Sequence, residues 1–566
     1  MGGAKRGVSR ILSGSDAARP LLGVTGHNPP GTGHERPDGS NLRKHLNIRA
    51  PVMGENAPMS TATDPAAAEF PEFLDNYRKR LKQSFDPLAV PDEHHLERGF
   101  PPGLLREIRE CKPLSVVIPE EHGGRGHNVH EFLGVLAASS YESLALSLTL
   151  GINGGLFLQP VAKYGREEIQ GPVFRRFLEK GAMGGLMITE PDFGSDALRM
   201  RTQYTDEGDA YRLRGVKHWA GLTGQADFWL VAARRSEENG RLGRDIDFFV
   251  CDMAQADQEI VVEEYYNNLG LYMIPYGRNR IDIAVPKAQR LEPETTGLKM
   301  MLDMLHRSRA HFPGMGMGFL NRMLDEAVAH CQDRIVGGKK LIEYDQAEHR
   351  LARLQAWFTA CSAMCAWSSE NASVKRNLAK DDVPCNAIKS VVTDFMHDAS
   401  QSLLQLMGAK GYRLDHIAGR AMVDSRPFQI FEGSNDILYQ QISEGVIKSM
   451  RRLKSTNVSE FLGKSELTQR ASDYFNEALD FDVSFRMPQR KLVDLGRILG
   501  RIISMEMVIE MGERGFRNDL VKNCLAVMRQ DVEGILARYE GGKVTKVVED
   551  YLEGSSWLDY LRPQKV

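Results

Sequence analysis

Apolar residues recur at spacings of three and four from residue 70 to about residue 180, which is typical of amphipathic helices. The clearest stripe consists of Phe70, Phe73, Leu74, Tyr77, Leu81 and Phe85. From residue 183 the pattern changes to alternation, and two alternating runs on either side of Glu207-Gly208-Asp209 predict a β-hairpin. Helical spacing returns at about residue 297 and continues beyond residue 450.

The order of these segments is helices, then a compact β region, then helices. It is not an alternating strand–helix order, so a doubly wound nucleotide-binding sheet is disfavoured and an α+β, mainly α, chain is predicted. We expect helical domains at 61–182 and 296–450, a central β domain at 183–295 and a helical extension at 451–566. Residues 1–60 are rich in Gly, Pro, Asn and Ser without apolar periodicity, and are predicted to be disordered or mobile.

Composition excludes several classes of protein. The 566 residues carry 72 Lys and Arg against 75 Asp and Glu, a net charge of -3, which leaves no surplus to neutralise nucleic-acid phosphates. The seven cysteines form no Cys-x-x-Cys motif, so a disulfide scaffold and a zinc ribbon are disfavoured, and no metal-ligand set is evident. No secretory signal is recognised, and the expected location is the cytoplasm, or the mitochondrial matrix in a eukaryote.

One uncharged stretch raises the question of a membrane span. Residues 143–162 approach the roughly 20 residues that a bilayer requires. However, the stretch contains Asn153, Gln159, Pro160 and several glycines, which disfavour a lipid-facing helix. We predict two buried helical pieces with a turn between them, and no transmembrane segment.

Three segments stand out as candidates for chemistry. Residues 186–196 read Leu-Met-Ile-Thr-Glu-Pro-Asp-Phe-Gly-Ser-Asp, residues 215–221 read Gly-Val-Lys-His-Trp-Ala-Gly, and residues 428–436 read Phe-Gln-Ile-Phe-Glu-Gly-Ser-Asn-Asp. Residues 118–124 add Ile-Pro-Glu-Glu-His-Gly-Gly. With these motifs in this order, the sequence from about residue 70 to 450 resembles the acyl-CoA dehydrogenase family of flavoproteins.

The resemblance implies a fold and an activity. The fold would comprise an N-terminal helical domain, a central β-barrel domain and a C-terminal four-helix bundle. The reaction would be the FAD-dependent α,β-dehydrogenation of an acyl thioester, from acyl-CoA to trans-2-enoyl-CoA, with electrons passed to an electron-transfer flavoprotein. The family also implies a homodimer or homotetramer, and residues 451–566 resemble the extra helical domain of the long-chain type.

Removal of the α-proton of a thioester requires a base, and a carboxylate becomes a stronger base when apolar groups exclude water from it. Glu432 follows the apolar residues Phe428, Ile430 and Phe431. The resemblance implies that Glu432 is this base and that its backbone N–H helps to bind the thioester carbonyl. Without the motif at residues 186–196, Glu432 would be interpreted as an acid near the start of a helix; with that motif, the catalytic interpretation is favoured. Arg309 matches an active-site arginine, although an exposed helical charge is its simpler interpretation.

No side chain performs hydride chemistry, so a cofactor must. The resemblance places around FAD the residues Met187, Ile188, Thr189, Gly194, Ser195, Trp219, Gly221, Arg334, Gln405, Gly408, Ala409, Ser434 and Asp436. It places Ser195, Arg309 and Gly433 at the substrate. Taken singly, such residues also have ordinary roles, namely a salt bridge for the arginine, a helix cap for Ser434 and helix termination for the glycines.

The sequence departs from the family pattern at several positions. Gly221 stands where relatives usually place a threonine near the flavin, and His306 replaces an acid that commonly contacts the pantetheine. A second position that some relatives use for the base falls near Ser308, which is not a carboxylate. These differences leave open a dehydrogenase specific for an acyl-carrier-protein thioester. A flavin oxidase of the same fold and a non-catalytic flavoprotein scaffold are further alternatives, and the retained Glu432 weighs against the scaffold.

Overall fold

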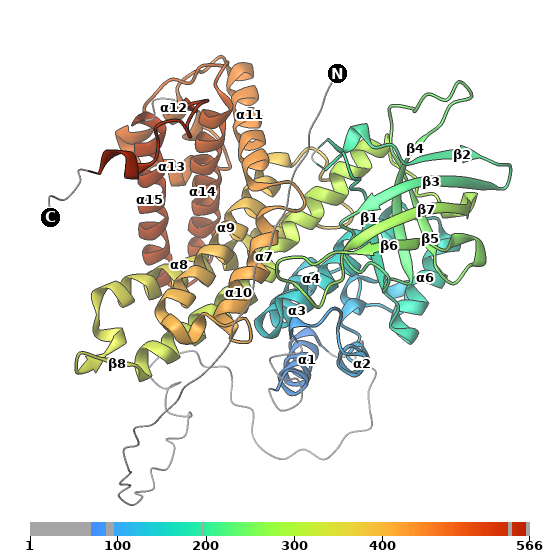
Figure 1. Ribbon diagram of the computed structural model, residues 1–566, viewed down its shortest axis with the longest axis horizontal. Coiled ribbons are helices and arrows are strands. Elements are labelled where there is room, and N and C mark those ends of the chain that lie inside the picture. Colours follow the sequence, from blue (N-terminus) through green and yellow to red (C-terminus); the bar gives the residue numbers. More distant parts are fainter. Residues whose placement is uncertain (1–68, 87–94, 195, 542–545, 562–566) are drawn as a thin grey trace, which may run out of the picture. The chain divides into compact units, whose positions relative to one another are not determined.

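The computed structural model describes residues 69–86, 95–194, 196–541 and 546–561 (Figure 1). The predicted disorder of residues 1–60 and the predicted role of Ser195 fall outside the described residues.

Helices form the first part of the chain. The apolar stripe predicted from residue 70 is confirmed as helix α1 (Phe70–Ser84), whose Phe73, Tyr77 and Leu81 are buried. The following helices are α2 (Pro102–Glu110), α3 (Val129–Glu142), α4 (Leu144–Gly151), α5 (Gln159–Tyr164) and α6 (Glu167–Lys180). Much of α3 is buried, and it packs against α1, α4 and α7.

The uncharged stretch is one continuous helix, so the turn predicted within it is wrong. A π-helical segment, Ile152–Leu158, joins α4 to α5. Within the π segment the polar side chain of Asn153 is hydrogen-bonded. It donates to the carbonyl oxygen of Thr149 at 2.7 Å and accepts from the backbone amide of Gly184 at 2.7 Å. Residues 144–164 are long and apolar enough to cross a bilayer, but 94% of an 18-residue apolar window within them is buried inside the protein.

The central region is a seven-stranded sheet with the path β1-β4-β2-β3-β7-β6, and β5 pairs with β4. Its strands are β1 (Gly184–Met187), β2 (Gln203–Asp206), β3 (Ala210–His218), β4 (Phe228–Arg235), β5 (Asp247–Asp252), β6 (Val261–Tyr265) and β7 (Gly277–Pro286). The predicted hairpin is confirmed, since β2 pairs antiparallel with β3 and Asp206 lies opposite Tyr211. Gly208 has φ +83° within this turn, a conformation that favours glycine.

Long helices follow the sheet: α7 (Gly297–Asp333), α8 (Asp345–Asn371), α9 (Asp382–Met407), α10 (Ile417–Ser425) and α11 (Asn435–Leu453). A short hairpin, β8 (Ile335–Val336) and β9 (Lys339–Lys340), separates α7 from α8. The glycines of α7 allow α3 to approach closely. A β-carbon added at Gly318 would lie 1.9 Å from the carbonyl oxygen of Ala137.

The C-terminal extension continues with α12 (Val458–Leu462), α13 (Gln469–Ser472), α14 (Gln489–Glu513) and α15 (Asn518–Gly541). The helices predicted here are confirmed in α14 and α15. Helix α14 packs against α8, α9 and α11, and α15 packs against α8 and α14 (Figure 1). The extension is therefore joined to the helices that carry the candidate site.

Candidate active site

A cavity of about 1580 Å³ brings together residues from the sheet, from the buried helices and from the extension. The lining includes residues of the motifs at 186–196 and 215–221, and it also includes Glu432 and Gly433. Apolar side chains on this lining include Leu148, Ile152, Leu156, Leu186, Met301 and Leu305. At another part of the lining lie Glu466, Leu467 and Glu510 of the extension.

Glu432 lies on a short loop between a 3₁₀ turn (Arg426–Gln429) and the start of α11. Its φ of +54° is unusual for a residue with a side chain, and Gly433 follows with φ +93°. Such a conformation costs about 1–3 kcal/mol and persists only where neighbouring contacts impose it. Arg309 imposes it by donating to the carbonyl oxygen of Glu432 from Nε at 3.0 Å and from Nη2 at 2.8 Å.

The two carboxylate oxygens of Glu432 differ in their hydrogen bonding. Oε1 accepts a hydrogen bond from the Ser308 hydroxyl at 2.9 Å. Oε2 is buried without a hydrogen-bond partner in the described part of the chain. Burial raises the pKa of Glu432, whereas the Ser308 hydrogen bond and the charges of Arg309 and Lys389 act to lower it. A buried carboxylate with a raised pKa and a free oxygen is suited to accept a proton.

Arg309 is buried on α7, so its interpretation as an exposed helical charge is wrong. Besides the carbonyl of Glu432, it donates to Oδ1 of Asn386 at 2.7 Å. Burial lowers the pKa of its guanidinium. Arg309 lines the cavity, but the contacts of its side chain show it holding the loop that carries Glu432. Its contact with substrate stays a prediction.

Lys389 supports the same loop and was not identified from the sequence. It lies on α9, fully buried, and its ammonium donates to the carbonyl oxygen of Gly433 at 2.8 Å and to Oδ1 of Asn435 at 2.9 Å. Burial, reinforced by the charge of Arg309, lowers the pKa of Lys389 to about 7. In the sequence, only its position beside the apolar face of a predicted helix could have pointed to Lys389.

The predicted flavin residues Ile188, Thr189, Gly194, Trp219 and Gly221 line the same cavity as Glu432. Trp219 has φ +54°, and its side chain is 54% exposed, which is unusual for tryptophan. Met187 is buried in β1 and is not among the residues that line the cavity, so its contact with FAD stays a prediction.

A buried ion pair contacts this part of the lining. The ammonium of Lys217 donates to Oε1 of Glu190 at 2.9 Å and to the carbonyl oxygen of Ile188 at 3.0 Å. Glu190 also accepts from the backbone amides of Arg201 and Thr202. Both members lie in the recognised motifs, but no role was predicted for either. The pair fixes the strand end that presents Ile188 and Thr189 to the cavity.

The remaining predicted cofactor residues are not brought to this cavity within the chain. Arg334 is exposed beside the β8–β9 hairpin, and Gln405, Gly408 and Ala409 are exposed at the end of α9. Ser434 precedes α11, and its side chain makes no capping hydrogen bond. The carboxylate of Asp436 pairs with Arg497 of α14 at 3.0 Å. Their contacts with FAD stay predictions.

Three family models match the chain in succession. Residues 68–181 match the acyl-CoA dehydrogenase N-terminal domain, residues 185–283 the middle domain, and residues 295–447 the C-terminal domain. The chain belongs to the acyl-CoA dehydrogenase family. It is an oxidoreductase of that type, and the three matches leave the extension uncovered.

Named relatives agree with this membership. An acyl-CoA dehydrogenase of Bacillus subtilis is 24% identical over 365 residues, covering 64% of this chain and 92% of the relative. The probable acyl-CoA dehydrogenase FadE10 of Mycobacterium tuberculosis is 28% identical over 421 residues, 71% of this chain but only 62% of the relative. The solved acyl-CoA dehydrogenase of Bacillus anthracis, complexed with FAD, covers 84% of this chain and 88% of its own with a TM-score of 0.65 and 17% identity, which shows the common fold.

Proposed function

We propose that this acyl-CoA dehydrogenase removes one hydrogen each from Cα and Cβ of an acyl-CoA thioester with FAD as its cofactor, giving the trans-2-enoyl thioester. The observation that carries the proposal is the free, buried oxygen of Glu432, in the same cavity as Ile188, Thr189 and Trp219. A proton acceptor and residues suited to contact a flat cofactor thus line one cavity.

These lining residues fit a flavin. Trp219 lines the cavity and is about half exposed. His218 has a buried Nε2 without a partner in the described residues, while its Nδ1 lies 2.9 Å from the Tyr266 hydroxyl. A β-carbon added at Gly194 would meet no atom within 4 Å, so open space adjoins the backbone there. When bound, FAD would accept the hydride that leaves Cβ.

The chain's own residues then supply the acid–base part of the reaction. Glu432 takes the α-proton on Oε2, while Ser308 keeps Oε1 in place. The backbone N–H of Glu432 is the proposed donor to the thioester oxygen as negative charge develops there. Arg309 and Lys389 prevent the loop from moving away by holding two successive carbonyl groups.

We further propose that the enzyme passes its electrons to an electron-transfer flavoprotein, that it is a homodimer or homotetramer, and that it is located in the cytoplasm or the mitochondrial matrix. The proposal also includes a division into domains at 61–182, 183–295, 296–450 and 451–566. It assigns cofactor contacts to Arg334, Gln405 and Gly408. Support comes from the family membership, whose matches cover residues 68–181, 185–283 and 295–447.

The decisive experiment is flavin bleaching by a panel of acyl-CoA and acyl-carrier-protein thioesters without oxygen, followed by reoxidation with electron-transfer flavoprotein. We expect bleaching by acyl-CoA, formation of the 2-enoyl thioester, and little peroxide in air. Glu432→Gln should retain FAD and lose at least about a thousand-fold in bleaching rate, within the range of general-base catalysis. Unchanged bleaching by this variant would contradict the base assignment, and stoichiometric peroxide would indicate an oxidase.

A further inference from the structure

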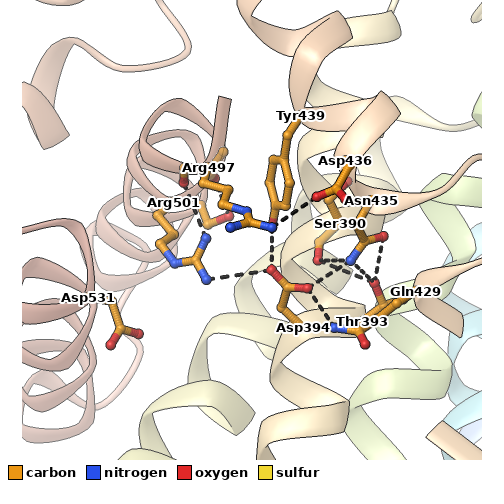
Figure 2. Close-up of polar contacts among 12 residues, drawn as sticks. Ser390, Thr393, Asp394, Gln429, Asn435, Asp436, Tyr439, Arg497, Arg501 and Asp531 are labelled. Atoms are coloured by element: carbon orange, nitrogen blue, oxygen red, sulfur yellow. Dashed lines mark hydrogen bonds and ion pairs between the residues drawn. The ribbon is translucent and has the colours of Figure 1, made fainter. Parts of the chain in front are cut away.

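A buried polar network connects the C-terminal extension to the loop that carries Glu432. At its centre is Asp394, in the middle of α9, with a side chain that is 17% exposed. Figure 2 shows Asp394 between Arg501 of α14 on one side and Asn435 and Gln429 on the other. The network therefore spans three elements that are far apart in the sequence.

On the loop side, Asp394 binds both ends of the catalytic segment. Its Oδ1 accepts from Gln429 Nε2 at 2.9 Å and from Asn435 Nδ2 at 2.8 Å. Gln429 lies three residues before Glu432, and Asn435 lies three residues after it. One carboxylate oxygen thus fixes the separation of the two points from which the loop departs.

Asn435 in turn contacts a residue that holds the backbone beside the base. Oδ1 of Asn435 accepts hydrogen bonds from the Lys389 ammonium at 2.9 Å and from the Thr393 hydroxyl at 3.2 Å. The same ammonium of Lys389 donates to the carbonyl oxygen of Gly433 at 2.8 Å. A shift of the Asp394 carboxylate would therefore be transmitted through Asn435 and Lys389 to the residue next to Glu432.

On the other side, α14 supplies a cation to this buried carboxylate. Arg501 Nη2 lies 3.6 Å from Asp394 Oδ2, which also accepts from the Tyr439 hydroxyl at 2.6 Å. The Arg501 side chain is only 10% exposed. Arg497, one turn earlier, donates to Asp436 at 3.0 Å (Figure 2). Both arginines lie beyond residue 447, where the family match ends.

We propose that the extension sets the geometry of the catalytic loop through the ion pair of Arg501 with Asp394, which makes Arg501 a positioning residue. A largely buried carboxylate deprived of its cation is strongly disfavoured and moves. Such a movement weakens its hold on Gln429 and Asn435. The kinetic part of this inference rests on the proposed function, and the structural part does not.

The test compares Arg501→Met with Arg501→Lys in the FAD-bound, full-length protein. Misplacing a catalytic group by about 1 Å costs on the order of a hundred-fold in rate. We expect Arg501→Met to lower kcat for acyl-CoA by at least about ten-fold with KM changed less than about three-fold, and Arg501→Lys to recover most of kcat. Amide hydrogen exchange in residues 428–436 should accelerate in Arg501→Met.

The matched control is Arg470→Gln, which removes two other ion pairs of the extension, with Glu506 and Glu513. Arg470 Nε lies 2.6 Å from Glu506 Oε1, and this pair joins α13 to α14 without touching the catalytic loop. If Arg501→Met matches this control in kcat and in loop exchange, the inference is overturned. A wild-type protein that oxidises no thioester would instead sink the proposed function, and loop exchange would still decide the role of Arg501.

A second variant covers the case in which Arg501→Met does not fold. Tyr439→Phe removes only the hydroxyl that donates to Asp394 at 2.6 Å. We expect a smaller loss of kcat, about three-fold, with faster exchange in residues 428–436 and retained FAD. Wild-type values for both measurements would contradict the proposed network.

Discussion

Replacing Ser308 with alanine probes the protonation of Glu432 directly. The Ser308 hydroxyl donates to Oε1 of Glu432 at 2.9 Å and thereby favours the ionised carboxylate. Its removal should raise the pKa of Glu432 above its already raised value, because burial then acts with less opposition. In the pH profile of kcat/KM, the fall on the acid side (the acid limb) should move to higher pH. The value on the plateau above it should change little.

The size of the shift follows from the strength of this hydrogen bond. A hydrogen bond to a charged group contributes about 1.5–3 kcal/mol, and water in the cavity can replace part of it. A residual loss of about 1.4 kcal/mol corresponds to a shift of one pH unit. Below the acid limb, Ser308→Ala should therefore be about ten-fold slower than wild type at the same pH.

The assay is the pH dependence of flavin bleaching under anaerobic conditions, with Ser308→Thr as the matched control. Threonine keeps the hydroxyl and should keep the wild-type acid limb. An acid limb that stays in place in Ser308→Ala, or moves to lower pH, would refute the assignment of Glu432 as the titrating base.

Two further predictions concern buried contacts. Lys217→Met leaves the carboxylate of Glu190 buried without its cation, so we expect a loss of about 3 kcal/mol in stability and weaker FAD retention, measured by thermal unfolding and by flavin release; an unchanged melting temperature would contradict this. Gly318→Ala places a β-carbon 1.9 Å from the carbonyl oxygen of Ala137 and should cost about 1–3 kcal/mol, whereas Gly171→Ala, with no atom within 4 Å, should be neutral or slightly stabilising.

Local periodicity accounts for what could be predicted of the fold. The stripe beginning at Phe70 and the alternation around Gly208 correspond to α1 and to the β2–β3 hairpin. The π segment from Ile152 to Leu158 could not be predicted in this way, because its helical geometry depends on contacts of Asn153 and of the glycines with other elements. Glycine-rich sequence alone favoured a turn.

The candidate site could be predicted where its residues lie within motifs, as at Glu432 and Trp219. Lys389 and Asp394 could not, since polar residues beside an apolar helical face ordinarily face solvent. They are buried or nearly so because α9 packs against α7, α11 and α14 at once. Arg501 is 107 positions from Asp394 in the sequence, so only the packing of α14 reveals their contact.

The charges around Glu432 are arranged to hold the loop without neutralising the base. Arg309 directs its donors to the carbonyl oxygen of Glu432, and Lys389 directs its ammonium to the carbonyl oxygen of Gly433. A direct ion pair with the carboxylate would lower its pKa strongly and occupy the oxygen that must take the proton. Because they bind the backbone, Arg309 imposes the strained φ of Glu432 and Lys389 holds the next carbonyl group, and Oε2 is left without a partner in the described residues. Arg501 also leaves the base unpaired, since its ion pair is with Asp394.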